Sequence, residues 1–390
     1  MTCMKKLVLV ILTVASLGAQ SQKFDLSPQA RVSIITCGPS QSEVFTAFGH
    51  DAIRVYDSIQ GLDYAYNYGV FDFNKPNFYL NFARGIPFYM LGVYSYSDFR
   101  DIYIYYNRSV TEQVLNLSQS QKQAIYDYLE WNAQPENENY RYDYFYNNCA
   151  TKVRDVFANV LKDSIQFDGS FITTNYSIRD LTDIYLKQQP WGDLGIDICL
   201  GLPMDKKATV WEYMFLPDYV ESSFDHVSIN KNGEVVPIVE YKRPIYLTRP
   251  ASIPESLVHP WTVFGGWLVL TIALSVYDMQ RKKISKWFDI VLFGVTGLIG
   301  VLLLLLWTVT NHQAAANNFN LLWALPTHLF VIVITRKKSA PFLRKYYLGV
   351  TVLSVLLLIT WVFLPQHLNI FLLPMVASFT CRAWVISRLL

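Results

Sequence analysis

The sequence predicts an α+β extracytoplasmic domain followed by an all-α membrane domain with five transmembrane helices. The chain has 390 residues, of which 52% are hydrophobic and only 16% charged, whereas a soluble domain carries about 25% charge. The apolar excess lies mainly in the last third. The charge is also divided, because residues 1–260 have a net charge of −7 and residues 261–390 a net charge of +9. The overall charge of +2 excludes a strongly basic nucleic-acid binder.

The N-terminus has the pattern of an export signal. Lys5 and Lys6 precede a short apolar core, Leu7–Leu17, and small residues follow it. We therefore expect residues 1–19 to be a cleaved signal peptide. The alternative is an uncleaved N-terminal anchor, although the apolar core is short for a bilayer span.

Five apolar stretches make up the expected membrane domain, residues 256–390. They are Trp261–Tyr277, Phe288–Thr310, Phe319–Thr335, Tyr346–Leu364 and Leu368–Ser387, each about one bilayer thickness long as a helix. Lys and Arg occupy the loops after the first and third stretches and are absent from the loops after the second and fourth. Because basic loops stay in the cytoplasm, residues 20–255 and the loop Asn311–Asn320 are expected in the periplasm of an inner-membrane protein.

The outer domain, residues 20–255, mixes strand and helix patterns. Alternation of apolar and polar residues indicates strands, and apolar residues at helical spacing indicate amphipathic helices. The expected elements are a strand at Ala52–Tyr56, a strand or helix at Val44–Phe48, helices at Ser118–Trp131 and Cys149–Leu161, a loop at Pro135–Tyr140, strands around Val235–Tyr241 and a linker at Arg249–Pro260.

Three cysteines are expected outside the membrane in the processed chain, namely Cys37, Cys149 and Cys199. An odd number leaves at least one thiol without a partner in the chain, which is unusual in an oxidising compartment. Cys149 opens a predicted helix, where the dipole and free backbone N–H groups favour thiolate. From spacing alone, Cys149 could also be a buried apolar residue or a disulfide partner of Cys37 or Cys199. The sequence does not decide whether Cys37 and Cys199 form a disulfide.

A thiolate nucleophile needs an imidazole within hydrogen-bond reach. The outer domain proper has two histidines, His50 and His226, and His50 directly precedes the strand predicted at Ala52–Tyr56. A lone histidine is more often structural than catalytic, so both interpretations of His50 stay open at this point. No Cys-x-x-Cys or His-x-x-x-His pair suggests zinc, and we predict neither a metal nor another cofactor.

The order of these residues resembles that of a known superfamily. Gly49-His50-Asp51-Ala52 followed later by Asn148-Cys149-Ala150-Thr151 resembles the circularly permuted papain-like hydrolases and acyltransferases, which include the NlpC-type peptidases and the lecithin:retinol acyltransferase (LRAT) group. More specifically, nearly the whole chain after the signal is similar to the Lnb family of lipoprotein N-acyltransferases. Further matching segments are Thr36-Cys37-Gly38-Pro39, Tyr68-Gly69-Val70-Phe71-Asp72-Phe73, Phe82-Ala83-Arg84-Gly85 and Asn320-Leu321-Leu322-Trp323-Ala324.

This resemblance implies acyl transfer between two membrane substrates. Cys149 would attack an ester of a membrane phospholipid, giving an acyl-thioester and a lysophospholipid. The α-amine of a diacylated lipoprotein's N-terminal cysteine would then take the chain as an amide. His50 would act as the base, and the backbone N–H of Cys149 would help to hold the oxyanion. The alternative is a membrane-tethered cysteine phospholipase or peptidoglycan peptidase of the same superfamily.

Further residues have two interpretations each. Asn67 would orient His50 by a hydrogen bond or simply pair within the sheet, because the strand after His50 has no second histidine. Asn148 would donate to the oxyanion or cap a helix. Arg84 would grip a phosphate or form a surface ion pair.

The outer loop that matches the family is also a candidate for substrate binding. Its polar residues His312, Asn318 and Asn320, with Trp323 after them, would position a lipid ester or the incoming amine. The alternative is ordinary hydrogen bonding at the membrane interface, where tryptophan is common.

Overall fold

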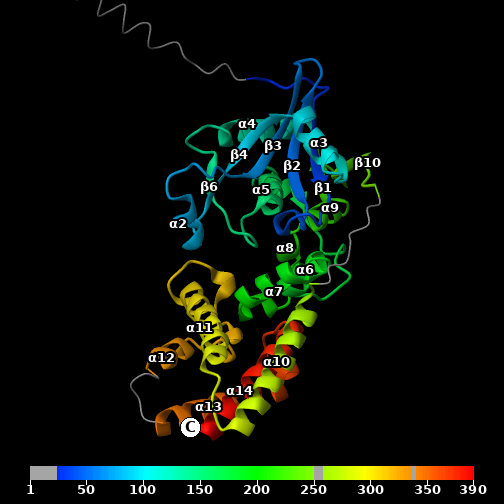
Figure 1. The fold of residues 1–390 in the computed structure, drawn as a ribbon. Coiled ribbons are helices and arrows are strands. Elements are labelled where there is room, and N and C mark those ends of the chain that lie inside the picture. Colours follow the sequence, from blue (N-terminus) through cyan, green and yellow to red (C-terminus); the bar gives the residue numbers. More distant parts are fainter. Residues whose placement is uncertain (1–23, 250–257, 335–339) are drawn as a thin grey trace, which may run out of the picture.

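The computed structural model of the protein describes residues 24–249, 258–334 and 340–390. The predicted signal peptide, residues 1–19, lies outside these residues, as does most of the predicted linker. Figure 1 shows a mixed α+β domain at one end of the molecule and a group of long helices at the other. The predicted fold class, an α+β domain followed by a helical membrane domain, is therefore confirmed.

A seven-stranded antiparallel sheet forms the centre of the outer domain. Its strand order is β10-β5-β1-β2-β3-β4-β6. The strands are β1 (Arg31–Cys37), β2 (His50–Asp57), β3 (Leu62–Val70), β4 (Phe88–Ser95), β5 (Val110–Leu115), β6 (Asn139–Arg141) and β10 (Val239–Tyr246). A small second sheet contains β7 (Ile165–Gln166), β8 (Ser228–Lys231) and β9 (Glu234–Pro237).

Both faces of the main sheet are covered. Side chains alternate between the two faces along a strand, and Ile34 and Ile53 pack in the larger core with the helix α5 (Cys149–Leu161). Their neighbours Ile35 and Ala52 pack on the other face, in a cluster that includes residues of α3 (Tyr96–Tyr105). Because both faces are covered, β2 is buried without interruption from Asp51 to Val55, including the charged side chain of Arg54.

Other helices complete the outer domain. They are α2 (Phe78–Ala83), α4 (Gln119–Asn132), α6 (Ile178–Leu186), α7 (Pro190–Cys199), α8 (Val210–Tyr213) and α9 (Pro217–Phe224). Ser118 caps α4 as predicted, since its side chain accepts from the backbone N–H of Gln121 and the Gln121 side chain bonds back to the backbone N–H of Ser118. The segment predicted as strand or helix forms a short 3-10 helix, Val44–Thr46.

Four helices in the described part of the membrane domain are long and apolar enough to cross a bilayer. They are α10 (Pro260–Arg281), α11 (Lys286–Thr308), α13 (Ala340–Thr360) and α14 (Leu373–Leu389). The third predicted span, Phe319–Thr335, is described only up to Ile334, because residues 335–339 lie outside the described part of the chain. Residues Phe319–Leu322 form a 3-10 helix, and the following helix α12 (Thr327–Ile334) is short as far as the described residues extend. Hydrogen bonds from Asn320 to the outer domain hold the start of this stretch, so its α-helical part begins at Thr327 and not at Phe319.

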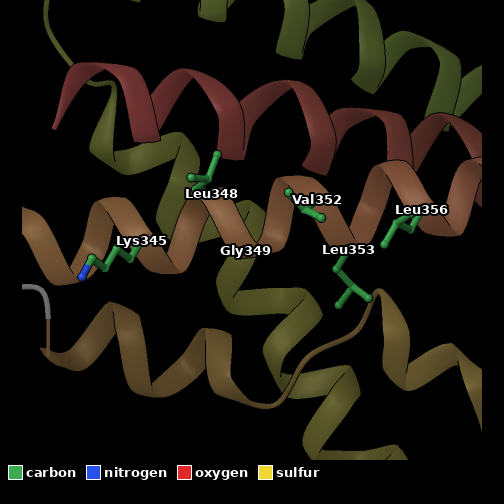
Figure 2. A pocket seen from close by; sticks show the side chains of 6 residues that line it. All are labelled: Lys345, Leu348, Gly349, Val352, Leu353 and Leu356. Carbon is green, nitrogen blue, oxygen red and sulfur yellow. The ribbon is translucent and has the colours of Figure 1, made fainter.

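One face of α13 is apolar and uncovered by protein. Leu348, Val352 and Leu356 are about half exposed there, in a shallow groove that Lys345, Gly349 and Leu353 also line (Figure 2). Exposed apolar side chains on a helix long enough to span a bilayer are typical of a surface covered by lipid. The exposed apolar side chains on this face are therefore the pattern expected of a helix embedded in a membrane.

The two domains are joined at α7. The backbone N–H of Gly201 donates to the carbonyl of Ala314 at 2.7 Å, and the Gln366 amide donates to the carbonyl of Leu200 at 3.0 Å. A Cβ atom on Gly201 would lie 1.9 Å from the carbonyl oxygen of Ala316, so only glycine permits this approach. These contacts fix the outer domain relative to the membrane helices.

Candidate active site

Cys149 is the first residue of α5, and a helix cap fixes its position. The Asn148 side chain accepts from the backbone N–H of Thr151 at 2.9 Å, and the Thr151 hydroxyl oxygen accepts from the backbone N–H of Asn148 at 2.8 Å. Val153 and Phe157 on the same helix are completely buried in the core beneath it. The helix therefore begins at a defined point on the sheet and holds the thiol at its end.

Asn148 is fully used as a cap. Its amide nitrogen donates to the carbonyl oxygens of Tyr144 at 2.9 Å and Phe215 at 2.7 Å. An amide has two N–H donors, and both are occupied here. This geometry supports the capping interpretation of Asn148 and leaves it no donor for an oxyanion.

His50 begins β2 and lies beside Cys149 across Gly69 of β3. A Cβ atom placed on Gly69 would lie 3.6 Å from the Cβ of Cys149 and 3.8 Å from the Cε1 of His50. Gly69 also has a φ of +94°, which residues with a side chain rarely adopt. Glycine at this position keeps the space between the imidazole and the thiol open.

Asn67 fixes the tautomer of His50. The Nε2 atom of His50 lies 2.6 Å from the Oδ1 of Asn67. An amide oxygen only accepts hydrogen bonds, so Nε2 carries the proton and Nδ1 keeps its lone pair. The ring of Tyr103 lies nearly parallel to the imidazole, with ring centroids 6.0 Å apart. The ring of His50 is thus held in one orientation with a free basic nitrogen.

The imidazole is neutral at neutral pH. Burial lowers the pKa of His50 to about 4, the hydrogen bond with Asn67 acts in the opposite direction, and the positive charge of Arg108 lowers the pKa further. Neutral imidazole is the form that accepts a proton, so His50 is suited to act as a base.

The thiol is also neutral at rest. Burial raises the pKa of Cys149, while backbone N–H groups at Asp51, Ala150 and Cys149 itself lower it. From the helix terminus we expected a stabilised thiolate, but desolvation outweighs that effect here. The pair is therefore a neutral thiol beside a neutral imidazole.

Several residues around His50 and Cys149 were missed by the sequence analysis. The guanidinium of Arg108 is buried, donates from Nε to the carbonyl of Gly38 at 2.8 Å and lies over the ring of Tyr103. Asp51 is completely buried, and burial raises the pKa of its carboxyl group. Only the packing of α3 on the sheet brings Tyr103 to His50, and no local sequence signal shows that contact.

A cavity of about 650 Å³ contains Cys149 and His50. Its wall is mainly aromatic and includes Phe71 and Phe73 from the connection between β3 and α2, Phe78, Tyr79 and Phe82 from α2, and Tyr89 from β4. Phe73, Tyr79 and Phe82 are more than half exposed, so the apolar wall continues to the surface. In Figure 1, α2 lies on the side of the outer domain that faces α11. The cavity is thus suited to a long apolar group that enters from the membrane side.

The membrane domain supplies the opposite wall. Asn311–Ala314, which follow the outer end of α11, also line the cavity. The backbone N–H of Asn311 donates to the carbonyl of Arg84 at 2.9 Å. Gly85 has a φ of +72°, and a Cβ atom there would lie 2.9 Å from the backbone of Asn311 and His312. Arg84 contributes its carbonyl to this contact, while its side chain is exposed and outside the cavity wall.

His312 is the one polar residue predicted in the outer loop that lies in the cavity wall. Asn318 and Asn320 are buried, and both amides donate to the carbonyl of Ile198 at the end of α7. The indole N–H of Trp323 donates to the Asn320 side chain at 2.8 Å. These three residues fasten the membrane domain to the outer domain and do not line the cavity.

The cysteines Cys37, Cys149, Cys199 and Cys381 are all free. Cys37 is completely buried in β1, whereas Cys149 and Cys199 are partly accessible. The Cys37–Cys199 pair that the sequence left open is therefore not formed.

A cluster of three carboxylates has oxygen atoms close enough together to hold a metal ion. Oxygen atoms of Asp183, Asp193 and Asp197 lie within 4.8 Å of one another. Burial, with the negative charge of Asp197 next, raises the pKa of Asp183 to about 9, so it is protonated at neutral pH. Arg179 and Asn369 already donate to Asp197. These residues belong to the domain junction and do not line the cavity.

Comparison with known proteins identifies both parts of the chain. Residues 23–183 match the family model described as Lnb N-terminal periplasmic domain. Residues 252–390 match the model described as Lnb transmembrane domain. No curated protein and no solved structure matches the chain. The first matched segment contains Cys149, His50 and Asn67, and the second contains His312.

Proposed function

The chain belongs to the Lnb family, a family of lipoprotein-processing membrane enzymes whose catalytic domain is periplasmic, and on this premise we propose that it is a lipoprotein N-acyltransferase. The acyl donor is a membrane phospholipid, and the acceptor is the α-amine of a diacylated lipoprotein's N-terminal cysteine. We assign the permuted papain-like cysteine domain to residues 20–255 and the membrane domain to residues 256–390. No cofactor takes part.

The first half-reaction forms a thioester on Cys149. Nδ1 of His50 takes the thiol proton as the sulfur attacks the ester carbonyl, and the backbone N–H of Cys149 at the free end of α5 stabilises the oxyanion. His50 then protonates the departing glycerol oxygen, and a lysophospholipid leaves. Asn67 holds Nε2, which leaves Nδ1 as the free nitrogen for these proton transfers.

The second half-reaction forms an amide. The amine attacks the thioester carbonyl, the C–S bond breaks, and the thiol is restored. A thioester is reactive enough to acylate an amine, and the apolar wall limits competing water. A cysteine nucleophile suits this reaction because its thioester can be formed from an ester donor and can then acylate an amine to give the amide product.

One observation carries this proposal. The cavity that contains Cys149 is walled by aromatic side chains on one side and, on the other, by Asn311–Ala314, which directly follow the outer end of the transmembrane helix α11. Lipid esters lie at the boundary of the bilayer core, which is also where α11 ends. The same wall argues against the peptidoglycan peptidase, because a polar peptide does not match it.

Trapping of the thioester tests the proposal. The full-length protein in lipid vesicles with acyl-labelled phospholipid should acquire a label on Cys149 that hydroxylamine removes. Addition of a diacylated lipopeptide should transfer the label to its N-terminus, which mass spectrometry locates. Cys149→Ala should abolish both signals, and Cys199→Ala, which removes a thiol outside the cavity wall, should abolish neither.

Two outcomes would contradict the proposal. Unchanged N-acylation by Cys149→Ala would exclude the thioester. Release of free fatty acid by the wild-type protein, with no labelled lipopeptide, would favour the phospholipase.

A further inference from the structure

We propose that His312 and Asp143 form the acceptor end of the cavity, where Asp143 attracts the incoming α-ammonium group and His312 takes its proton. This inference rests on the function proposed above and assigns a second base, distinct from His50, to the second half-reaction. His312 is contributed by the membrane domain and Asp143 by the outer domain, and both line the cavity.

The hydrogen bonds of His312 fix its tautomer. Its Nδ1 lies 2.7 Å from the Oγ1 of Thr310. Thr310 donates its single hydroxyl proton to the carbonyl of Leu306, also at 2.7 Å, so its oxygen acts as the acceptor toward His312. Nδ1 therefore carries the ring proton and Nε2 keeps a lone pair. Burial lowers the pKa of His312, against the opposing effect of Asp143, so the neutral form is favoured.

Asp143 gives this end of the cavity a negative charge. Its Oδ1 accepts from the backbone N–H groups of Phe145 and Tyr146, each at 3.0 Å. Its Oδ2 makes no hydrogen bond with a described residue. Asp143 is the single acidic residue in the cavity wall, to which neither Lys nor Arg contributes. The wall itself therefore favours a cationic group at this place, and the nearby guanidinium of Arg141, which donates to the carbonyl of Gly85 at 3.2 Å, is not part of the wall.

The proton balance explains why a second base is useful. An α-amino group has a pKa of about 7.7–8.0, so much of the acceptor arrives as ammonium near pH 7. Nε2 of His312 takes one proton and frees the lone pair, and the nitrogen attacks the thioester carbonyl. After attack, the nitrogen passes a second proton to His50, which delivers it to the sulfur as the C–S bond breaks. His312 then releases its proton to water, and the products are the amide and the Cys149 thiol.

The first half-reaction, in which the phospholipid donates its acyl chain, needs no second base. The thiol proton moves to His50 and from there to the leaving glycerol oxygen, so one imidazole is sufficient. Loss of His312 should consequently affect the two half-reactions differently. This difference separates His312 from His50, whose loss should stop both.

The experiment measures the half-reactions separately. His312→Gln and the matched control His226→Gln, an exposed histidine outside the cavity, are first loaded with labelled phospholipid and then mixed with a diacylated lipopeptide. We expect thioester formation by His312→Gln within about twofold of wild type and transfer slower by about 100-fold, the scale of general base catalysis. His226→Gln should behave as wild type in both steps.

The pH dependence distinguishes a base from a structural residue. Transfer by His312→Gln should recover between about pH 7 and 9, because the acceptor amine loses its proton without help in that range. The other titratable residues in the cavity wall are Asp143, His50, Cys149, Tyr79, Tyr89, Tyr142 and Tyr144, and they are present in both proteins. Equal slowing of both half-reactions, normal transfer at pH 7, or slow transfer at every pH would overturn the assignment.

Asp143→Asn keeps the Oδ1 acceptor and removes the charge. It should raise the KM for the lipopeptide about tenfold and leave thioester formation unchanged with both phosphatidylethanolamine and phosphatidylglycerol. A loss specific to phosphatidylethanolamine would instead show that Asp143 binds the cationic headgroup of the donor, which contradicts the inference. Absence of a thioester in the wild-type protein would refute the proposed function itself, which is a different result.

Discussion

His50 and Asn67 lie on neighbouring strands of the main sheet, with the imidazole Nε2 2.6 Å from the amide oxygen. Because both residues belong to a sheet that is covered on each face, the hydrogen bond sets the direction of the ring before any substrate arrives. The free nitrogen, Nδ1, is the one available to Cys149.

Replacement of Asn67 should slow thioester formation without unfolding the protein. Asn67→Ala removes the acceptor of the ring proton, and we expect a rate about 10- to 100-fold lower because orientation of a general base is lost. Asn67→Asp keeps the acceptor and should restore much of the rate. Single-turnover labelling with phospholipid measures this effect. Identical rates for Asn67→Ala and wild type would remove Asn67 from the site.

The acid limb of the pH profile should lie far below the usual histidine range. Burial holds the pKa of His50 at about 4, so the imidazole stays neutral and basic until the pH falls toward that value. Thioester formation should therefore decline through about pH 4 and not through 6.5. In Asn67→Asp the carboxylate stabilises the imidazolium, and the limb should move to higher pH. A wild-type limb near 6.5 would mean that His50 is solvated.

Gly85→Ala should disturb the cavity from the membrane side. The alanine would have to adopt a φ of +72° and would press on the backbone of Asn311 and His312 at 2.9 Å. Gly61→Ala is the matched control, because Gly61 has a φ of +69° with no atom within 4 Å. Both variants should lose about 1–3 kcal/mol of stability from backbone strain, but Gly85→Ala alone should lose acyl transfer. Thermal unfolding and transfer assays on both variants would separate the effects, and equal activity would refute this interpretation.

Arg179→Ala should destabilise the domain junction. The guanidinium of Arg179 is almost completely buried and pairs with Asp197 at 2.6 Å and Asp205 at 3.0 Å. Removal of one member of a buried ion pair costs about 3–5 kcal/mol, because the partner charges remain without compensation. Arg100→Ala, at the more exposed pair with Asp101, should cost less than about 1 kcal/mol. The apparent melting temperatures of the two variants in detergent provide the measurement, and equal shifts would contradict the prediction.

Local sequence patterns predicted the elements that depend on local rules. The helix Cys149–Leu161 begins and ends where its apolar spacing indicates, and Ser118 caps α4 as expected. The third predicted span starts later than Phe319, at Thr327, because hydropathy does not register tertiary hydrogen bonds. Asn318 and Asn320 bind the backbone near Ile198, and this holds the start of the stretch against the outer domain.

The candidate site was only partly predictable, because a sequence shows local patterns and not tertiary contacts. Cys149 and His50 carry visible signals, a helix start and a strand start. Asp143 and Tyr103 carry none, because only the folding of distant segments brings Asp143 into the cavity wall and Tyr103 against His50. The effect of burial on the pKa of Cys149 was also invisible, since the helix dipole is readable from sequence and desolvation is not.

The approach of Gly85 to Asn311 and His312 has a consequence for how this protein can change. Each half of the chain shapes the other half's side of the cavity, so the halves are not interchangeable modules. A chimera that joins the outer half of one relative to the membrane half of another would place a foreign backbone against Gly85. Such a chimera should be functional only when its Phe82–Gly85 segment and its Asn311–Ala314 loop come from the same relative.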